Sequence, residues 1–157
     1  ASGTLSEGQT IFVPDAQLDW VTRQEINGDL FVSPLKRRYY LSSNYGWRAS
    51  PFTDKRSFHT GIDMATGEGT AVYPALIGQV SATGYNAVYG NYVIVAHHSG
   101  YRTLYAHLSS ISCKKGQSVG TSSVIGRVGN TGLSTGPHLH FTVYKNGKTV
   151  NPLSLMK

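Results

Sequence analysis

The sequence predicts an all-β domain, built as a small antiparallel β barrel or sandwich of short strands. Its 157 residues are enough for one domain with a hydrophobic core. Glycine is frequent, with 18 residues, and tyrosine reaches 10. Short apolar runs are separated by turn signals, and no amphipathic run of helical period exceeds about two turns. Glycine and aromatic residues distributed in this way are typical of antiparallel sheets and not of helical bundles.

Residues 1–33 differ in composition from the rest of the chain, and we interpret them as an N-terminal lead-in segment. The run 7–14 resembles the tail of a LysM-type wall-binding repeat, and a simple β-strand is the alternative interpretation. We expect the segment to pack on the main domain through Trp20 and Phe31. A further hypothesis is that Trp20 and its neighbours cover a functional groove. The main domain then comprises residues 34–157.

From residue 35 onward, strand-like apolar runs alternate with turns. The predicted strands are residues 70–73, 76–82, 92–97, 101–108, 124–128 and 139–144. Dipeptides that contain glycine separate them, namely Ser99-Gly100, Lys115-Gly116, Gly129-Asn130 and Asn146-Gly147. Because Asn-Gly favours a two-residue hairpin turn, we expect residues 149–150 to return beside the strand 139–144.

The chain is basic, with a formal net charge of +6 and a pI of about 9.5. This balance favours anionic partners such as nucleic acid, acidic lipid headgroups or a bacterial cell wall. Aromatic and basic residues do not interleave on a predicted strand, which argues against a nucleic-acid-binding module. No apolar run is long enough to cross a membrane. The single cysteine, Cys113, excludes an intramolecular disulfide, and the lysines that follow it favour a lowered thiol pKa.

Two histidines, His138 and His140, stand one residue apart at the start of the strand predicted for residues 139–144. Side chains at i and i+2 leave a strand by the same face, so both imidazoles should point into one region. From this spacing alone, two interpretations remain open. One is a polar outer face of the strand, and the other is a pair of imidazoles that binds a ligand.

A second pair, His59 and Asp63, has a spacing of four residues, and Gly61 between them permits a tight bend around a bound ion. Imidazole nitrogen and carboxylate oxygen both suit zinc. One histidine of the 138/140 pair would complete three ligands and leave a tetrahedral position for water, as in catalytic zinc sites. The other member of that pair and His107 remain as candidate acid–base groups. Alternation places His107 on the same strand face as Tyr105.

These residues lie in motifs that resemble the M23 family of zinc metallopeptidases, the lysostaphin/LytM-type endopeptidases. The motifs are His59-x-x-x-Asp63, Tyr105-Ala106-His107-Leu108, His138-Leu139-His140-Phe141, Tyr45-Gly46-Trp47-Arg48, Gly90-Asn91-Tyr92-Val93, Gly126-x-Val128-Gly129-Asn130-Thr131-Gly132, Ser134-Thr135-Gly136-Pro137 and Val150-Asn151-Pro152-Leu153. They occur in the family's order over residues 30–155. The resemblance implies a small antiparallel β barrel with an open zinc groove.

By this resemblance, His59, Asp63 and His140 are the ligands of one zinc ion that keeps an open position for water. His138 is the general base on that water, and His107 stabilises the oxyanion or assists proton transfer. No substrate-binding residue is assigned. The implied activity is hydrolysis of peptide bonds in peptidoglycan stems or cross-links. Peptidoglycan is therefore the expected partner, and the protein is expected to be exported to the periplasm or the cell surface.

The chain departs from many relatives at Thr142, which stands where they carry a carboxylate. Thr142 shares a strand face with His140, so we expect it to alter the contacts that orient this imidazole. The alternative function is a non-catalytic peptidoglycan-binding or hydrolase-activating domain of the same fold. Such degenerate relatives typically lack ligands, whereas this chain has all five expected residues. His97 and His98 are expected to be structural or surface residues.

Overall fold

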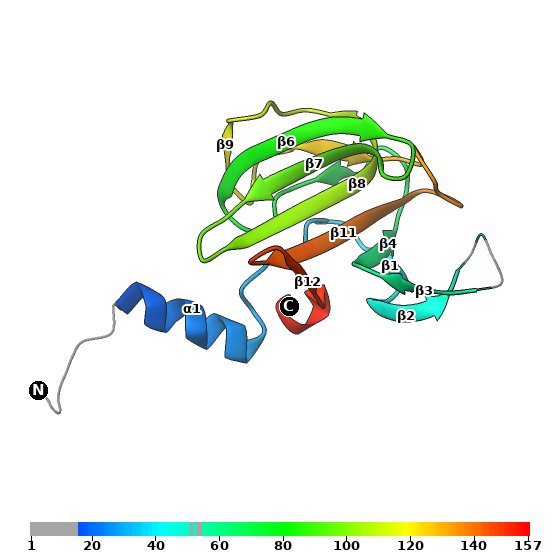
Figure 1. Cartoon of the computed structure of the whole chain (residues 1–157). Coiled ribbons are helices and arrows are strands. Elements are labelled where there is room, and N and C mark those ends of the chain that lie inside the picture. The colour runs from blue at the N-terminus through cyan, green and yellow to red at the C-terminus, as the bar shows by residue number, and fades with distance from the viewer. Residues whose placement is uncertain (1–15, 51, 53–54) are drawn as a thin grey trace, which may run out of the picture.

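The computed structural model describes residues 16–50, 52 and 55–157, which form a mainly β structure (Figure 1). The helical elements are α1 (Ala16–Asn27) and one 3₁₀ turn, η1 (Pro152–Ser154). A two-stranded sheet pairs β2 (Gly46–Ala49) with β3 (Arg56–His59). The ten-stranded sheet contains β1 (Tyr40–Ser43), β4 (Ile62–Ala65), β5 (Ala71–Val72), β6 (Gly78–Asn86), β7 (Gly90–Ala96), β8 (Tyr101–Ile111), β9 (Ser118–Val119), β10 (Gly126–Val128), β11 (His138–Lys145) and β12 (Lys148–Val150).

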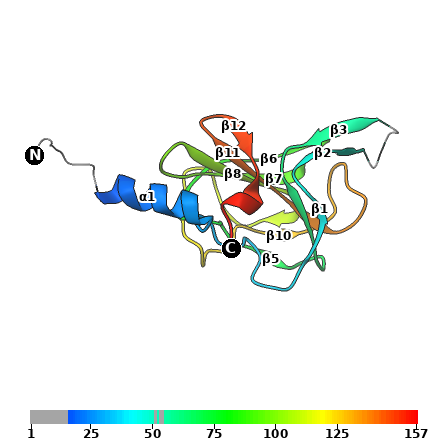
Figure 2. The same cartoon turned by 90° about the horizontal axis from the view of Figure 1, so that it is seen from below.

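The longest strand, β8, has 11 residues and pairs with three different neighbours. Its N-terminal part lies between β7 and β11, with Leu104 opposite Ile94 on one side and Thr142 on the other. Its C-terminal end pairs with β10, where Ile111 lies opposite Gly126. Because the partner changes along one strand, the sheet folds over itself, and Figure 2 shows β5 and β10 beneath β6, β7, β8 and β11. Every strand pair of the sheet is antiparallel, which confirms the predicted fold class.

The hydrophobic core fills the space inside the folded sheet, and β11 shows how the sequence directs residues into it. Leu139, Phe141 and Val143 are fully buried members of the core cluster. The residues that alternate with them, including His138 and His140, leave by the other face because successive strand side chains alternate. The period of two in residues 138–143 therefore separates core side chains from candidate site side chains.

The six predicted strands overlap β5, β6, β7, β8, β10 and β11, and the hairpin return overlaps β12. Three of the four predicted turns, Ser99-Gly100, Lys115-Gly116 and Asn146-Gly147, are turns in the structure, whereas Gly129 forms an antiparallel bridge with His138. Asn146 and Gly147 have φ values of 51° and 83°, the positive values that a two-residue hairpin turn of this type requires. The sequence does not predict β1, β2, β3, β4 or β9. Each has two or four residues, which offer few alternating positions for a periodic signal, although the equally short β5 and β10 lie within apolar runs that were predicted as strands.

The N-terminal lead-in segment only partly follows the expectation. Phe31 is 1% exposed and packs in the core, and its amide donates to the Leu155 carbonyl at 2.8 Å. Trp20 is 63% exposed, so its predicted packing on the main domain is wrong. It lies on α1 beside Val21, which is buried on a different side of the helix. The 12 residues of α1 also exceed the two helical turns that the sequence was expected to allow.

The end of α1 is tied to the sheet by Glu25, which accepts a hydrogen bond from the Tyr101 hydroxyl and forms an ion pair with Lys145 at 3.5 Å. Figures 1 and 2 both show α1 at the end of the molecule remote from β2 and β3. The run 7–14 lies outside the described residues, and the domain boundary at residue 34 stays a prediction. Within the described part of the chain, no helix has the length and apolar character to span a membrane.

Candidate metal centre

The central strand β11 positions His140 between two other elements of the site. Its neighbour β4 places Asp63 directly opposite His140, and β8 places Ala106 opposite it on the other side. His138 lies two residues before His140 and lines the same cavity, which confirms the prediction that the two imidazoles point into one region. This arrangement favours the interpretation of a ligand-binding pair over that of a polar outer face.

His59 and Asp63 reach the same point from two different strands. His59 ends β3 and Asp63 lies in β4, and the atoms His59 Nε2 and Asp63 Oδ1 are 3.2 Å apart. Gly61 lies between the strands, where a Cβ atom would meet the Phe141 carbonyl oxygen at 2.2 Å. Glycine is therefore required at this position for close approach of the chain to β11, at the bend that joins β3 to β4.

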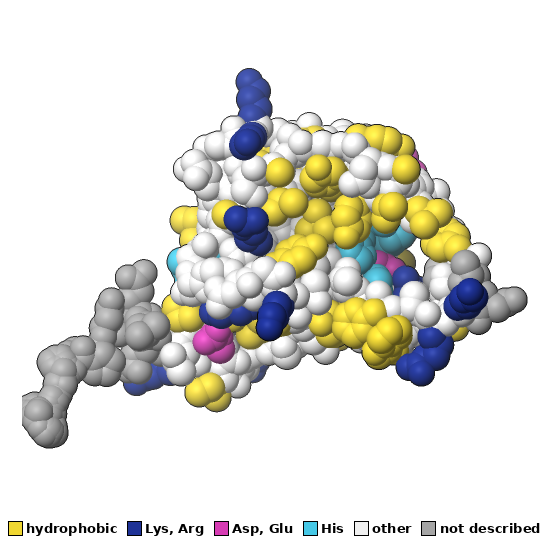
Figure 3. Space-filling view, viewed as in Figure 1, with side chains coloured by type: hydrophobic (Ala, Val, Ile, Leu, Met, Phe, Trp, Pro, Cys, Tyr) yellow, Lys and Arg dark blue, Asp and Glu magenta, His cyan; other side chains and the backbone are white. Residues whose placement is uncertain are grey.

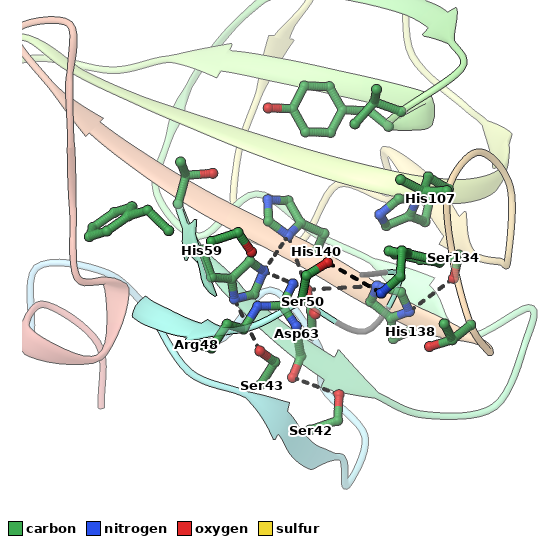
Figure 4. A pocket seen from close by; sticks show the side chains of 18 residues that line it. Ser42, Ser43, Arg48, Ser50, His59, Asp63, His107, Ser134, His138 and His140 are labelled. Carbon is green, nitrogen blue, oxygen red and sulfur yellow. Dashed lines mark hydrogen bonds and ion pairs between the residues drawn. The ribbon is translucent and has the colours of Figure 1, made fainter. Parts of the chain in front are cut away.

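Three donor atoms of these residues converge on one point (Figure 4). Asp63 Oδ1 lies 3.0 Å from His140 Nδ1 and 3.2 Å from His59 Nε2, and the two nitrogens are 3.2 Å apart. Donors bound at about 2.0–2.1 Å to a tetrahedral ion lie roughly 3.3 Å from one another. The observed spacing fits a small tetrahedral cation such as zinc.

The protonation states of the cluster also suit a cation. Burial raises the pKa of the Asp63 carboxyl, but hydrogen bonds and charge from His140 and His59 outweigh this effect and hold its pKa well below the usual range. Burial lowers the pKa of His140, which favours its neutral imidazole. An ionised carboxylate and a neutral imidazole are the forms in which these side chains bind metal ions.

Neighbouring groups orient both imidazoles with the correct nitrogen toward the cluster. The Asn44 carbonyl accepts from His59 Nδ1 at 2.9 Å, which leaves the His59 Nε2 lone pair facing Asp63. On the other imidazole, the Thr142 hydroxyl lies 2.7 Å from His140 Nε2 and can accept its proton, which directs Nδ1 toward the cluster. The expectation that Thr142 contacts and orients His140 is confirmed, with a hydroxyl in the place of a carboxylate.

His107 and His138 lie together beside the cluster, with ring centroids 4.8 Å apart. His138 Nδ1 donates to the Gly136 carbonyl at 2.8 Å, and its Nε2 is 3.7 Å from Asp63 Oδ1. His107 Nδ1 donates to the Thr131 carbonyl at 2.7 Å, so its Nε2 carries a lone pair. Burial lowers the pKa of His107 to about 4, so the imidazole is neutral near pH 7 and available as a proton acceptor.

A β-bulge delivers His107 to the site and corrects the prediction that it shares a face with Tyr105. Tyr105 and Leu108 both point into the core, although three positions separate them, whereas His107 lines the cavity. The ladder between β7 and β8 shifts register here, and His107 has a φ of 62°. One extra residue with positive φ reverses the alternation of side chains after Tyr105. A strict period of two in the sequence does not reveal this reversal.

The cluster lies in an open cavity of about 440 Å³. Figure 3 shows histidine and acidic side chains at the bottom of a hollow on this face of the molecule. The described residues of α1 do not line the cavity, so the hypothesis that Trp20 covers the groove is wrong for this structure. Sequence reasoning did not assign most residues of the wall, and two of them lie next to the cluster. Tyr89 stacks on His140 at 5.9 Å, and Arg48 extends from β2, although the sequence had placed Arg48 in a motif.

Other candidate residues lie away from the cavity. His97 contacts Thr103 at 2.8 Å through Nε2 and the Ile77 carbonyl at 2.9 Å through Nδ1, and His98 is exposed, which agrees with the expected structural and surface roles. Cys113 is buried, and burial raises the pKa of its thiol. The expected lowering of that pKa by the adjacent lysines is therefore wrong, because desolvation of the thiolate dominates.

Comparisons with known proteins bear on this site. The chain matches the sequence model of peptidase family M23 over residues 57–152. The DD-carboxypeptidase/endopeptidase Mpg of Neisseria meningitidis is 45% identical over 115 residues, which cover 73% of this chain and 26% of that protein. The peptidoglycan DD-endopeptidase ShyA of Vibrio cholerae is 41% identical over 121 residues, covering 76% of this chain and 28% of that protein.

The same similarity extends to solved structures. A zinc containing peptidase from Vibrio cholerae matches with a TM-score of 0.74 and 36% sequence identity, and the match covers 79% of this chain and 39% of that chain. This chain spans only 26–28% of the length of the two curated relatives, Mpg and ShyA. The similarity therefore concerns one domain-sized part of longer proteins.

Proposed function

Because the chain belongs to peptidase family M23, we propose that it is a zinc-dependent endopeptidase that hydrolyses peptide bonds in the stems or cross-links of bacterial peptidoglycan. The observation that carries the proposal is the convergence of His59, Asp63 and His140 at 3.0–3.2 Å beside two further histidines. A site that only bound its ligand would have no need of acid–base groups next to a metal centre. The printed names of the relatives Mpg and ShyA, a DD-carboxypeptidase/endopeptidase and a peptidoglycan DD-endopeptidase, support the substrate class.

The donor set fits zinc with three protein ligands and one open position, the arrangement of a catalytic site. His59 would bind through Nε2, His140 through Nδ1 and Asp63 through Oδ1. A bound zinc ion supplies Lewis acidity toward the substrate carbonyl and toward a water molecule. The Asn44 carbonyl and the Thr142 hydroxyl hold the two imidazoles in the orientation that this binding needs.

His138 and His107 are the proposed acid–base pair. His138 Nδ1 is committed to the Gly136 carbonyl, so Nε2 is the atom that accepts a proton from the attacking water. His107 Nδ1 is likewise committed to the Thr131 carbonyl, and its Nε2 is the atom that assists proton transfer or stabilises the developing oxyanion. Each ring donates a hydrogen bond from Nδ1 to a main-chain carbonyl, so both rings are oriented before the substrate binds.

Peptidoglycan lies outside the cytoplasm, so we place this activity in the periplasm or at the cell surface. The net charge of +6 favours approach to an anionic cell wall. The cavity volume of about 440 Å³ is within the usual range for a ligand site.

The test is the release of soluble muropeptides from purified sacculi, with the products identified by mass. We expect release that a chelator abolishes and that added zinc restores. The matched control is His98→Ala, which removes an exposed histidine outside the cavity and should retain full activity. Stoichiometric zinc binding with no release under any condition would contradict the hydrolase. It would favour the alternative, a non-catalytic binding or hydrolase-activating domain.

A further inference from the structure

Arg48 lies in the wall of the cavity next to the proposed metal centre. In the β2–β3 hairpin, Arg48 pairs with Ser57, and Gly46 pairs with His59. Residues two apart on a strand share a face, so Arg48 and His59 lie on the same side of the hairpin. Figure 4 shows the Arg48 side chain extending from the hairpin beside His59. The α-carbons of such diagonal neighbours are about 7–8 Å apart, a distance that an arginine side chain can span.

The guanidinium of Arg48 has no partner in the described part of the chain. Its Nε is buried without a hydrogen-bond acceptor, and no described carboxylate forms an ion pair with it. Another cation of the hairpin, Arg56, faces the opposite side and lies over the Trp47 ring at 5.5 Å. A buried donor without an acceptor is unfavourable unless a ligand satisfies it. The Arg48 guanidinium can therefore donate hydrogen bonds to an acceptor group of a ligand that enters the cavity.

The charge of the cavity specifies what that acceptor is. Among its described lining residues, Arg48 is the only Lys or Arg, and Asp63 is the only carboxylate. Figure 3 shows basic side-chain atoms beside the histidine and acidic atoms in the hollow. Asp63 is already committed to His59 and His140, and a divalent cation there would leave the cavity with net positive charge. Planar guanidinium groups bind carboxylates through two parallel hydrogen bonds.

We propose that Arg48 binds a free carboxylate on the amine side of the scissile peptide bond. The inference rests on the proposed peptidoglycan endopeptidase function and narrows its substrate class. In a D-alanyl cross-link, the carboxyl group of D-alanine forms the scissile amide, so the nearest free carboxylate belongs to the amine component. A diamino dicarboxylic acid, which bears an amine and a carboxyl group on the same carbon at each end, carries that carboxylate on the carbon attached to the scissile nitrogen; lysine, whose side-chain amine is on a CH2 group, does not. A terminal D-alanine presents the same group, whereas the interior of a glycine bridge does not.

The geometry of the hairpin supports this assignment. The carboxylate carbon is two bonds from the scissile nitrogen, so it must lie close to the metal centre when the carbonyl is positioned for attack. Arg48 is the adjacent cation on the face that carries His59. The groove therefore selects bonds in which a D-alanyl carbonyl is joined to an amine that bears a carboxylate, and it disfavours glycyl-glycine bonds.

Two matched substrate pairs test the proposal. The first pair is an acylated peptide ending in D-alanyl-D-alanine and its C-terminal carboxamide. The second pair is a cross-linked muropeptide dimer and the dimer amidated at the diamino-acid carboxylate. For the zinc-loaded wild type, we expect kcat/KM to favour the carboxylate member about 10- to 100-fold, the scale of a hydrogen bond between charged groups. If the wild type prefers the carboxylate member in just one of the two pairs, that pair identifies the source of carboxylate that the site accepts.

The variants separate recognition from a structural role. Arg48→Met should make the two members of a pair equal, and Arg48→Lys should keep part of the preference because it retains the charge. Arg56→Met, on the other face of the same hairpin, is the matched control and should keep the full preference. A preference that persists in Arg48→Met, or one that the wild type lacks, would overturn the proposal.

A binding measurement distinguishes this proposal from the proposed function. Both dimers are titrated by calorimetry into wild-type protein and Arg48→Met with the metal removed by chelation. Tighter binding of the carboxylate dimer by the wild type alone supports the role of Arg48 even if neither dimer is hydrolysed. In that case the hydrolytic function fails and carboxylate recognition stands. Equal affinity of the two dimers for the wild type counts against Arg48, whatever the hydrolysis result.

Discussion

Replacing Thr142 with valine removes the hydroxyl that lies 2.7 Å from His140 Nε2 and leaves the shape of the side chain almost unchanged. Thr142 is fully buried and His140 is 5% exposed, so water cannot take the place of the lost acceptor. A buried donor without a partner costs about 1–3 kcal/mol. The imidazole also becomes free to turn its Nδ1 away from Asp63 and His59, which weakens the metal site.

The expected size of this effect follows from the same contact. Loss of a group that orients a metal-binding histidine typically lowers metal affinity about 10- to 100-fold. At about 1.4 kcal/mol for each tenfold change, this range agrees with the cost of the orphaned donor. We expect the zinc Kd of Thr142→Val to rise by that factor, measured by competition with a chromophoric chelator. Thr142→Ser, which keeps the hydroxyl, should restore most of the affinity.

A matched control is available elsewhere in the same sheet. Thr103 is also fully buried, and its hydroxyl lies 2.8 Å from Nε2 of His97, outside the cavity. Thr103→Val should lower the free energy of unfolding and leave the zinc Kd unchanged. The reasoning would be refuted if Thr142→Val kept the wild-type zinc Kd, or if Thr103→Val raised the Kd equally. Either result would mean that the Thr142 hydroxyl does not orient the metal-binding imidazole.

Four further predictions follow from the site and the core. Asp63→Ala should lose both zinc and activity, and a variant that keeps stoichiometric zinc by metal analysis would contradict the ligand assignment. His138→Ala and His107→Asn should keep zinc and lose turnover by roughly 100-fold or more, since asparagine tolerates the positive φ of residue 107; full turnover in either would exclude it from the chemistry. The pKa of His107 is lowered to about 4, so between that pH and about 6.5 the unfolded chain binds a proton that the folded chain does not. The free energy of unfolding of metal-free protein should therefore rise with pH over this window by up to about 3 kcal/mol, and urea titrations of His107→Asn should show a flatter pH dependence. Phe31→Ala should destabilise the domain by about 3–5 kcal/mol because this side chain is 1% exposed, whereas the exposed Trp20→Ala should change the urea midpoint little.

Local patterns in the sequence were sufficient to predict the long strands and their hairpin turns. In β11, the alternation of Leu139, Phe141 and Val143 with the two histidines is visible without any structure, and so is the turn at Asn146-Gly147. Helix α1 and the short strands β1, β2, β3, β4 and β9 were not predicted in this way. A strand of four residues has two inward positions, and the packing that stabilises it comes from distant parts of the chain.

The five candidate site residues could be named from the sequence. Histidine and aspartate are the side-chain types that metal binding and acid–base catalysis need, and here they occur in motifs that follow the order of the M23 family. Only the tertiary structure brought His140 to within 3.0–3.2 Å of Asp63 and His59, since it lies 77 and 81 residues away from them along the chain. The fold also decided the features that no period encodes. The bulge turned His107 out of the core, the pairing of β2 with β3 placed Arg48 beside His59, and burial lowered the pKa of His107 and of His140. The bulge, the position of Arg48 and the pKa shifts all depend on which strands, distant in the sequence, pair with one another. Local sequence patterns do not predict that pairing.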